Sequence, residues 1–244
     1  MAVGAKSRFL PNYYLKVSLA AWAPEESVEH YNFLLLKLLM RILKRGAEAV
    51  LYLEQAEEGR VLVKERIPKR YRLAELDTRL RKLRTRKEAR LLVEARKRGV
   101  PTPKIFEVDE QKAKIRMEFL EGKLLRDFLL EEKIDRIEKI CLKLGRLVGR
   151  LHAADLVHSD LTPSNIIVKN DELYFFDFGL GEFSRRVEDK AVDLRLLHQA
   201  LQATHGRILK KAWELIVKGY REEYKDAEKV LERMREIAKR VRYA

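Results

Sequence analysis

Residues 156–168 read LVHSDLTPSNIIV and carry the most informative polar residues of the chain. Asp160 stands two residues after His158, and Asn165 follows five residues later. A second acid, Asp177, comes twelve residues after Asn165 and opens an Asp-Phe-Gly triplet. This is the polar set of a phosphoryl-transfer site. Asp160 would orient or deprotonate an attacking hydroxyl or water, and Asn165 and Asp177 would hold Mg²⁺, which prefers oxygen ligands.

The residues around this stretch predict a local structure that suits the chemistry. Apolar residues at helical spacing predict a long helix over 134–154, which leads into the motif. Residues 165–168 and 173–176 predict a β-hairpin with both candidate metal ligands on its rim. His158 is expected to be structural and to support the backbone of the Asp-Phe-Gly triplet.

The overall charge favours a polyanionic partner. The chain has 244 residues, a charged fraction of 37% and a formal net charge of +14. Such an excess of positive charge most often binds nucleic acid and less often an anionic membrane. The alternative is a basic proteome or a basic surface for another partner.

The single cysteine and the absence of long apolar runs predict a cytoplasmic protein. Cys141 lies on an apolar helical face, where it is expected to be a small buried residue, and it can build no disulfide framework. No apolar run reaches the ~18 residues that span a bilayer, and the first residues lack the pattern of a signal peptide.

The beginning of the chain differs from the rest. Residues 1–39 are expected to be an N-terminal extension, helical or foreign to the natural product. The run from Pro24 to Ser27 could open a helix that continues to Arg45, with the proline and two acids in its first turn. From residue 42 the pattern turns strand-like, and 49–53 and 60–64 predict two strands. The turn before them contains Gly46 and Ala47 but no glycine-rich motif, so any phosphate contact there must use backbone N–H groups.

Lys64 and Glu88 each admit two interpretations. Lys64 closes the second strand, where it could point at phosphates or be an ordinary exposed lysine. Residues 73–83 and 85–99 predict two helices, with Thr85 as the N-cap of the second. Glu88 would then complete a capping box with Thr85 or be an exposed acid beside Arg90. Alternatively, it would form an ion pair with Lys64.

The predicted helices before Gly99 are strongly basic. Their excess of cations over acids favours contacts with a phosphate backbone rather than a solvated helix face of alternating charge. The cations are Arg79, Arg81, Lys82, Arg84, Arg86, Lys87, Arg90, Arg96, Lys97 and Arg98.

The remainder predicts a small β-rich half followed by a helical half. Residues 104–108 and 114–119 predict a hairpin, and 119–122 a hinge. Further helices are predicted over 124–132, from about 188 to 198, over 208–224 and over 227–244. The C-terminal tail is basic. No Ala-Pro-Glu triplet follows Gly179, so a long activation segment is missing.

Together these motifs resemble the small atypical kinase of the KEOPS complex, the PRPK family, which is related more distantly to RIO kinases. The residues that carry the resemblance are HSDLTPSN at 158–165, DFG at 177–179, EDKAVDL at 188–194, GAEA at 46–49 and KERIPKRYR at 64–72. The resemblance covers residues 40–244. It departs from the family at Ser159, where a glycine is common.

The resemblance implies an α+β, small bilobal protein-kinase-like fold. Residues 40–119 would form the β-rich N-lobe with its helices, and residues 120–244 a truncated helical C-lobe. Lys64 would contact the phosphates of ATP with Glu88 as its partner, Asp160 would be catalytic, and Asn165 and Asp177 would bind Mg²⁺. Gly46 and Ala47 would lie beside the phosphates, and the backbone of Glu118 and Leu120 would hold the adenine, after Met117.

The resemblance also implies a role in threonylcarbamoyladenosine modification of tRNA. The chain would be an ATP-dependent Ser/Thr kinase or ATPase that regulates a TsaD-like threonylcarbamoyltransferase subunit, with the small activator subunit of the KEOPS complex as a second partner. tRNA would contact the basic helices and the C-terminal tail, and no membrane is involved. The alternatives are a free-standing Ser/Thr or small-molecule kinase, and a non-catalytic tRNA-binding module.

Overall fold

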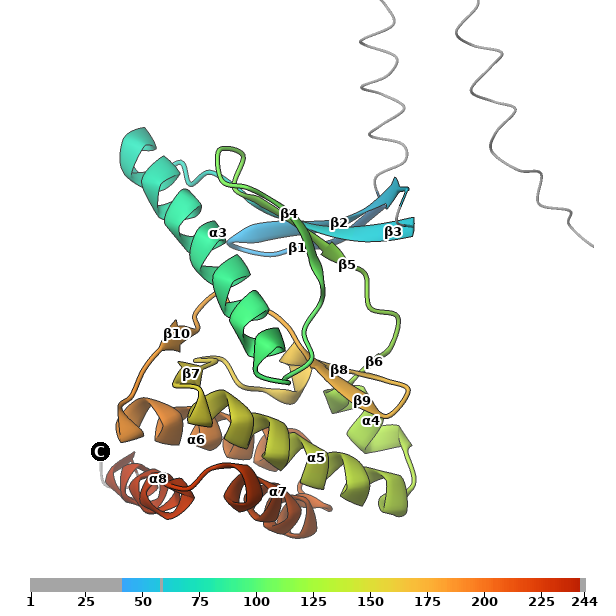
Figure 1. Ribbon diagram of the computed structural model, residues 1–244, viewed down its shortest axis with the longest axis vertical. Helices are drawn as coiled ribbons and strands as arrows, with labels where there is room; N and C mark the ends of the chain where they lie inside the picture. The colour runs from blue at the N-terminus through green and yellow to red at the C-terminus, as the bar shows by residue number, and fades with distance from the viewer. Residues whose placement is uncertain (1–40, 58, 242–244) are drawn as a thin grey trace, which may run out of the picture. The chain divides into compact units, whose positions relative to one another are not determined.

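The computed structural model describes residues 41–57 and 59–241 and contains a five-stranded sheet and a set of helices (Figure 1). The strand order is β1-β2-β3-β5-β4, and the pairs β2–β3, β3–β5 and β4–β5 are antiparallel. The strands are β1 Arg41–Arg45, β2 Ala49–Ala56, β3 Gly59–Arg66, β4 Ile105–Asp109 and β5 Lys114–Glu118. The two strands predicted over 49–53 and 60–64 and the hairpin over 104–119 are therefore confirmed.

The helix predicted to continue to Arg45 is wrong at its described end. Residues Arg41–Arg45 form β1, which lies beside β2 in the sheet. Leu, Lys and Arg favour helices, but hydrogen bonding to a neighbouring strand overrides this local preference. The rest of that predicted helix, and the predicted extension over 1–39, lie outside the described residues.

A single long helix, α3 (Ala74–Lys97), replaces the two predicted over 73–83 and 85–99. Thr85 is buried in the middle of this helix and caps nothing. No glycine or proline interrupts residues 74–97, so the helical hydrogen bonds continue through the predicted break. The capping-box interpretation of Glu88 is wrong for the same reason.

The second half of the chain consists mainly of helices, as predicted. They are α4 Leu125–Glu131, α5 Ile134–Ala153, α6 Val187–Thr204, α7 Leu209–Glu223 and α8 Ala227–Val241. Helix α6 continues beyond its expected end at His198. The predicted hairpin is confirmed as β8 Ile166–Lys169 and β9 Glu172–Phe175, and the shorter elements are β6 Lys123–Leu124, β7 Leu156–Val157, β10 Glu182–Phe183 and a 3₁₀ turn at Pro163–Asn165.

Helix α3 belongs to the cores of both halves. Ala89 packs with Ile115 and Met117 of β5 beneath the sheet. Leu91 and Leu92 join the large apolar cluster of the helical half. Glu88 precedes these residues and is therefore held at a fixed place between the sheet and the helices.

Two glycines allow α5 and α7 to pack with their backbones in near contact. A Cβ at Gly145 of α5 would lie 2.0 Å from the carbonyl oxygen of Ile216 in α7. A Cβ at Gly219 of α7 would lie 2.2 Å from the carbonyl oxygen of Leu142 in α5. This pair of helices forms the base from which the chain enters β7 and the motif at residues 156–168 (Figure 1).

Two further predictions have an outcome in the structure. Cys141 is buried in the large apolar cluster, and burial raises the pKa of its thiol to about 12, so it is a packing residue. Among the described helices, none is long and apolar enough to cross a membrane. The lobe boundary at residue 119 stays a prediction.

Candidate active site

Strand β3 delivers Lys64 to the space between the sheet and the helices. Side chains alternate along a strand, and Val61 and Val63 are buried on one face. Leu62 and Lys64 face the other way and line a cavity of about 450 Å³. The antiparallel neighbours β2 and β5 hold this strand on both sides, so the lysine projects from a rigid support.

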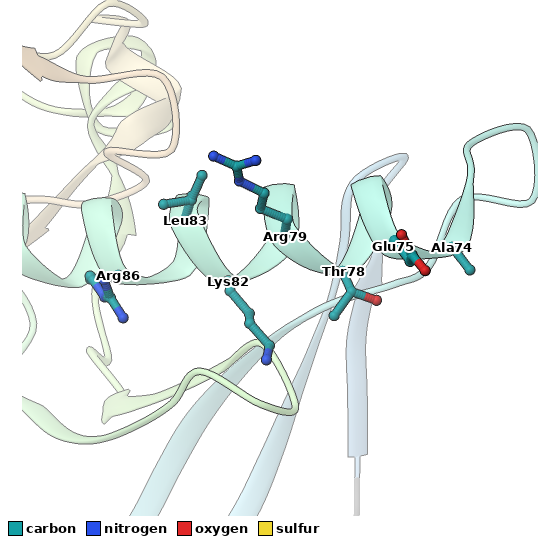
Figure 2. Close-up of a pocket in the computed structure, with 7 residues that line it drawn as sticks. All are labelled: Ala74, Glu75, Thr78, Arg79, Lys82, Leu83 and Arg86. Atoms are coloured by element: carbon teal, nitrogen blue, oxygen red, sulfur yellow. The ribbon is translucent and has the colours of Figure 1, made fainter.

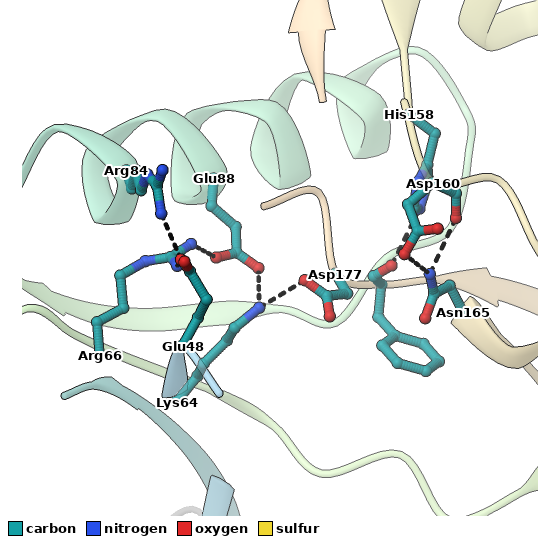
Figure 3. Close-up of polar contacts among 10 residues, drawn as sticks. Glu48, Lys64, Arg66, Arg84, Glu88, His158, Asp160, Asn165 and Asp177 are labelled. Carbon is teal, nitrogen blue, oxygen red and sulfur yellow. Dashed lines mark hydrogen bonds and ion pairs between the residues drawn. The ribbon is translucent and has the colours of Figure 1, made fainter. Parts of the chain in front are cut away.

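The fold brings Lys64 together with two carboxylates distant in sequence (Figure 3). Its Nζ donates to Oε1 of Glu88 at 2.6 Å and to Oδ1 of Asp177 at 2.6 Å. The Glu88 side chain is only 1% exposed, whereas that of Asp177 is 46% exposed. Glu88 therefore orients the lysine from within, and Asp177 offers its other oxygen to the cavity.

The shifts in pKa follow from this pairing. Burial by itself lowers the pKa of Lys64, but the charges of Glu88 and Asp177 outweigh it and raise that pKa above its ordinary value. Burial raises the pKa of Asp177, and the charge of Lys64 outweighs this and lowers it. The ammonium and the carboxylate are therefore both charged at neutral pH.

Asp160 and Asn165 form a second polar pair at the site. The Nδ2 group of Asn165 donates to the backbone oxygen of Asp160 at 2.9 Å and to its Oδ2 at 2.8 Å. The turn that begins at Pro163 holds Asn165 in this position. Because its amide nitrogen is engaged, the amide oxygen of Asn165 remains for a cation.

His158 supports the segment before the Asp-Phe-Gly triplet, as predicted. Its Nε2 donates to the carbonyl oxygen of Phe176 at 3.0 Å, and its ring packs on Phe178 with centroids 4.4 Å apart. Asp177 itself adopts φ 60°, a left-handed conformation that an aspartate tolerates better than most residues. The histidine thus fixes the backbone on which Asp177 is presented.

The 450 Å³ cavity has both apolar and polar lining. Leu51, Leu62, Leu92 and Met117 are among its apolar residues, and Lys64, Asn165 and Asp177 are among its polar ones. The predicted hinge residues Glu118 and Leu120 line it as well. The N–H of Glu118 donates to the Lys104 carbonyl at 2.8 Å, so contacts with a purine at Glu118 would use its carbonyl oxygen.

Comparisons with known proteins show the family of this chain. A family model described as "RIO domain" matches residues 55–180, just over half of the chain. A KEOPS complex subunit, Bud32, from Pyrococcus abyssi is 44% identical over 213 residues, which is 84% of this chain and 96% of that protein. The chain belongs to the RIO domain family. Within it, the chain belongs to the group that contains Bud32.

Longer relatives match almost the whole chain. A probable bifunctional tRNA threonylcarbamoyladenosine biosynthesis protein from Methanosarcina acetivorans is 41% identical over 98% of this chain. The chain spans 43% of that relative's length.

Solved structures share the fold at low sequence identity. The complex of WaaP with acyl carrier protein has a TM-score of 0.58 and 17% identity, and covers 86% of this chain and 92% of the solved chain. A Rio2 kinase complex with ADP, Mg²⁺ and phosphoaspartate from Chaetomium thermophilum has a TM-score of 0.57 and 15% identity over 84% of this chain and 72% of that one. The predicted α+β kinase-like fold is confirmed.

The oxygens of Asn165 and Asp177 fit the ligand preference of Mg²⁺. Mg²⁺ binds through one or two protein oxygens and completes its octahedron with water and substrate phosphates. Asn165 and Asp177 offer such oxygens on one cavity. In the described part of the chain, no group of three or more His, Cys, Asp or Glu side chains could hold a metal by itself, so a cation here would depend on phosphate oxygens.

The turn with Gly46 and Ala47 lies where the sequence predicted it. Both residues line a neighbouring cavity of about 370 Å³, together with Lys64, Asp160 and Asp177. The N–H of Gly46 donates to the carbonyl oxygen of Ala49 at 2.9 Å, which keeps the turn tight. The structure thus brings all nine predicted site residues to two adjoining cavities.

Two residues with evident structural roles at the site had no predicted role. Asp193 is buried, and its carboxylate accepts hydrogen bonds from the N–H groups of His158 at 2.6 Å and Ser159 at 2.7 Å. Arg66 is buried beside Glu88 and donates to its Oε2 at 2.6 Å. An acid on the apolar face of a helix was the available signal for Asp193. The signal for Arg66 was strand alternation: Arg66 lies two residues after Lys64, so both side chains are expected on the same face of the strand.

Ser159 occupies a backbone conformation that favours glycine. Its φ is 61°, a region where a side chain costs about 1–2 kcal/mol. We expect Ser159→Gly to raise the free energy of unfolding by about 0.5 kcal/mol, because relief of strain exceeds the entropy cost of glycine. Ser159→Val should lower it, since β-branched residues tolerate this region least. Urea denaturation of the three proteins checks the order Gly, Ser, Val, and a valine variant as stable as the glycine variant would contradict it.

A larger hollow, about 630 Å³, lies away from these cavities on the outward face of α3 (Figure 2). It is lined partly by Arg79, Lys82 and Arg86. Some of the basic residues that have no nearby acid in the sequence find a partner in the fold. Arg86 forms an ion pair with Glu110, and Lys82 donates a hydrogen bond to Gln111. Helix α3 still holds nine Lys and Arg against four Asp and Glu, so it remains a basic surface.

Proposed function

We propose that this chain binds Mg²⁺ and ATP in the two adjoining cavities and transfers the terminal phosphoryl group to water or a hydroxyl. The observation that carries the proposal is the position of Lys64, which is held by Glu88 and Asp177 on the cavity that Asn165 also lines. Lysine, acid and amide oxygen thereby converge on one place where a triphosphate fits.

Each residue has a role that follows from its contacts. Lys64 exchanges Asp177 for phosphate oxygens and keeps Glu88, its buried partner. Asp160 orients the attacking oxygen, and its bond to Asn165 fixes its side chain. Mg²⁺, when bound by Asn165 and Asp177, neutralises charge on the phosphates.

The remaining predicted residues bind the rest of the nucleotide. The carbonyl of Glu118 and the N–H of Leu120 contact the adenine against the apolar lining of the cavity. Gly46 and Ala47 cover the phosphates with their backbone, since the turn carries no glycine-rich motif.

We further propose that this ATP-dependent activity serves threonylcarbamoyladenosine modification of tRNA in a cytoplasmic KEOPS complex. The names of the relatives support the assignment. In the bifunctional relative the matching part is 43% of the polypeptide, which is consistent with a domain that acts alongside a second one. The partners in this proposal are a TsaD-like subunit, the small activator subunit, and tRNA on the basic face of α3 and the C-terminal tail.

The test is ATP hydrolysis by this chain alone, with a TsaD-like partner, with tRNA, and with both. We expect turnover to rise with each addition and to be highest with both, because the activity serves the partner rather than a separate substrate. Robust transfer to an added protein or small molecule without the partner would show a free-standing kinase instead. Salt-sensitive tRNA binding without turnover under any condition would show a non-catalytic binding module.

A further inference from the structure

Glu48 places a carboxylate in the short loop proposed to cover the phosphates. The loop joins β1 to β2, and Glu48 lines the 370 Å³ cavity together with Asp160 and Asp177. An uncompensated carboxylate beside a triphosphate is repelled by it. Its presence at this place therefore requires a compensating contact.

Two arginines from different elements compensate the charge of Glu48 (Figure 3). Its Oε2 accepts a hydrogen bond from Arg84 of α3 and lies 3.8 Å from Nη1 of Arg66 at the end of β3. Burial raises the pKa of Glu48, but the hydrogen bond and charge of Arg84 and the charge of Arg66 outweigh this and lower it. The carboxylate is thus charged and directed towards α3.

The same arginine links the loop to the lysine at the centre of the site. Arg66 is 6% exposed and binds Oε2 of Glu88, whose Oε1 binds Lys64. Opposite charges therefore alternate without interruption from the surface of α3 to the candidate metal ligand, in the order Arg84, Glu48, Arg66, Glu88, Lys64, Asp177.

One side-chain contact and one backbone contact anchor this loop to the segment after β3. Lys69 donates to the carbonyl oxygen of Ala47, and the N–H of Ile67 donates to the carbonyl oxygen of Glu48 at 3.3 Å. Both anchors come from the segment just after β3. Only Glu48 ties the loop to α3, the helix that carries Glu88, among the contacts of the described residues.

We propose that Glu48 is a latch, a positioning residue that fastens the loop of residues 46–48 to α3 through Arg84 and Arg66. Closure of the loop and placement of Glu88 against Lys64 then occur together, and the latch limits how fast nucleotide leaves. The inference rests on the proposed function, because it requires a nucleotide in the two cavities.

The test measures the release of a fluorescent methylanthraniloyl-ADP with Mg²⁺ from the full chain by stopped flow. Glu48→Gln keeps the shape of the side chain and removes its charge. Loss of a negative charge beside the phosphates alone would slow release, whereas loss of the latch speeds it. We expect release to be about two- to fivefold faster, the range that a partly exposed ion pair supports.

Two further variants decide whether Glu48 acts through Arg84. Arg84→Met should accelerate release to a similar extent, and the double variant should be no faster than either single one. Glu57→Gln is the matched control, since Glu57 is an exposed glutamate in the turn after β2, and it should leave the rate unchanged. Melting temperatures of all four variants should stay near that of the wild type, because Glu48 and Arg84 are partly exposed.

The outcomes separate the latch from the function on which it rests. Unchanged or slower release from Glu48→Gln, or additive acceleration in the double variant, overturns the latch while wild-type binding upholds the nucleotide site. Absence of binding to the wild-type chain overturns the proposed function and the latch with it.

Discussion

Replacing Asp160 by asparagine should reduce ATP turnover by about 10²–10⁴-fold, the usual contribution of a general acid or base. The substituted side chain retains its size and an oxygen that can accept the hydrogen bond from Asn165, which lies at 2.8 Å in the wild type. It cannot take a proton from the attacking oxygen. The apolar walls of the cavity and the Lys64 network are untouched, so nucleotide affinity should change little.

The measurement is steady-state phosphate release with the TsaD-like partner and tRNA present, together with nucleotide affinity by titration. Asp171→Asn serves as the control, because Asp171 is an exposed aspartate in the β8–β9 turn whose left-handed backbone asparagine also tolerates. Asp160→Ala should be at least as impaired as the asparagine variant. Wild-type turnover in either Asp160 variant would refute the assigned role.

Gly145→Ala should destabilise the protein by about 3 kcal/mol or more, which is the upper range for overpacking. Helix propensity alone predicts the opposite sign, because alanine is favoured over glycine by about 1 kcal/mol within a helix. Packing prevails since the new Cβ would lie 2.0 Å from the Ile216 carbonyl oxygen and 2.9 Å from the Tyr220 nitrogen. These are backbone atoms of α7, which cannot rotate away as a side chain can.

Thermal unfolding followed by circular dichroism checks this prediction. A loss of about 3 kcal/mol corresponds to roughly 6–12 °C in a domain of this size. Gly206→Ala is the control, because the nearest atom to its new Cβ is 3.8 Å away, and its melting temperature should stay unchanged or rise slightly. If Gly145→Ala melts within about 2 °C of the wild type, less than the shift expected for 1 kcal/mol, the close approach of α5 and α7 is not required.

The sequence predicted the parts of the site that lie close together in the chain. Asp160 and Asn165 are five residues apart, and the turn with Pro163 between them is short enough to fix their relation. Strand alternation and helical periodicity likewise predicted β2, β3, α5 and the β8–β9 hairpin. Local spacing suffices in these cases because each element forms its backbone hydrogen bonds within itself or with the element next to it in the chain.

The sequence did not decide between contacts that span long distances in the chain. Glu88 follows Thr85 by three residues, which favours a capping box, and the structure instead pairs it with Lys64, 24 residues away. The helix start at Thr85 was wrong because α3 runs without a break from Ala74 to Lys97 and places that threonine in its middle. The sequence likewise did not indicate that the partners of Asp193 are backbone N–H groups of the motif, since they lie 34 and 35 residues away in the chain.

By itself the sequence determined the chemical inventory: a lysine at the end of a strand, two acids and an amide at the spacing of a phosphoryl-transfer site, and a basic segment before Gly99. Only the tertiary structure decided which charges pair. Ion pairs depend on distance in space, and burial removes the solvent that would screen them. Glu88 orients Lys64 because α3 is one continuous helix packed against both halves, and no window of local sequence contains that fact.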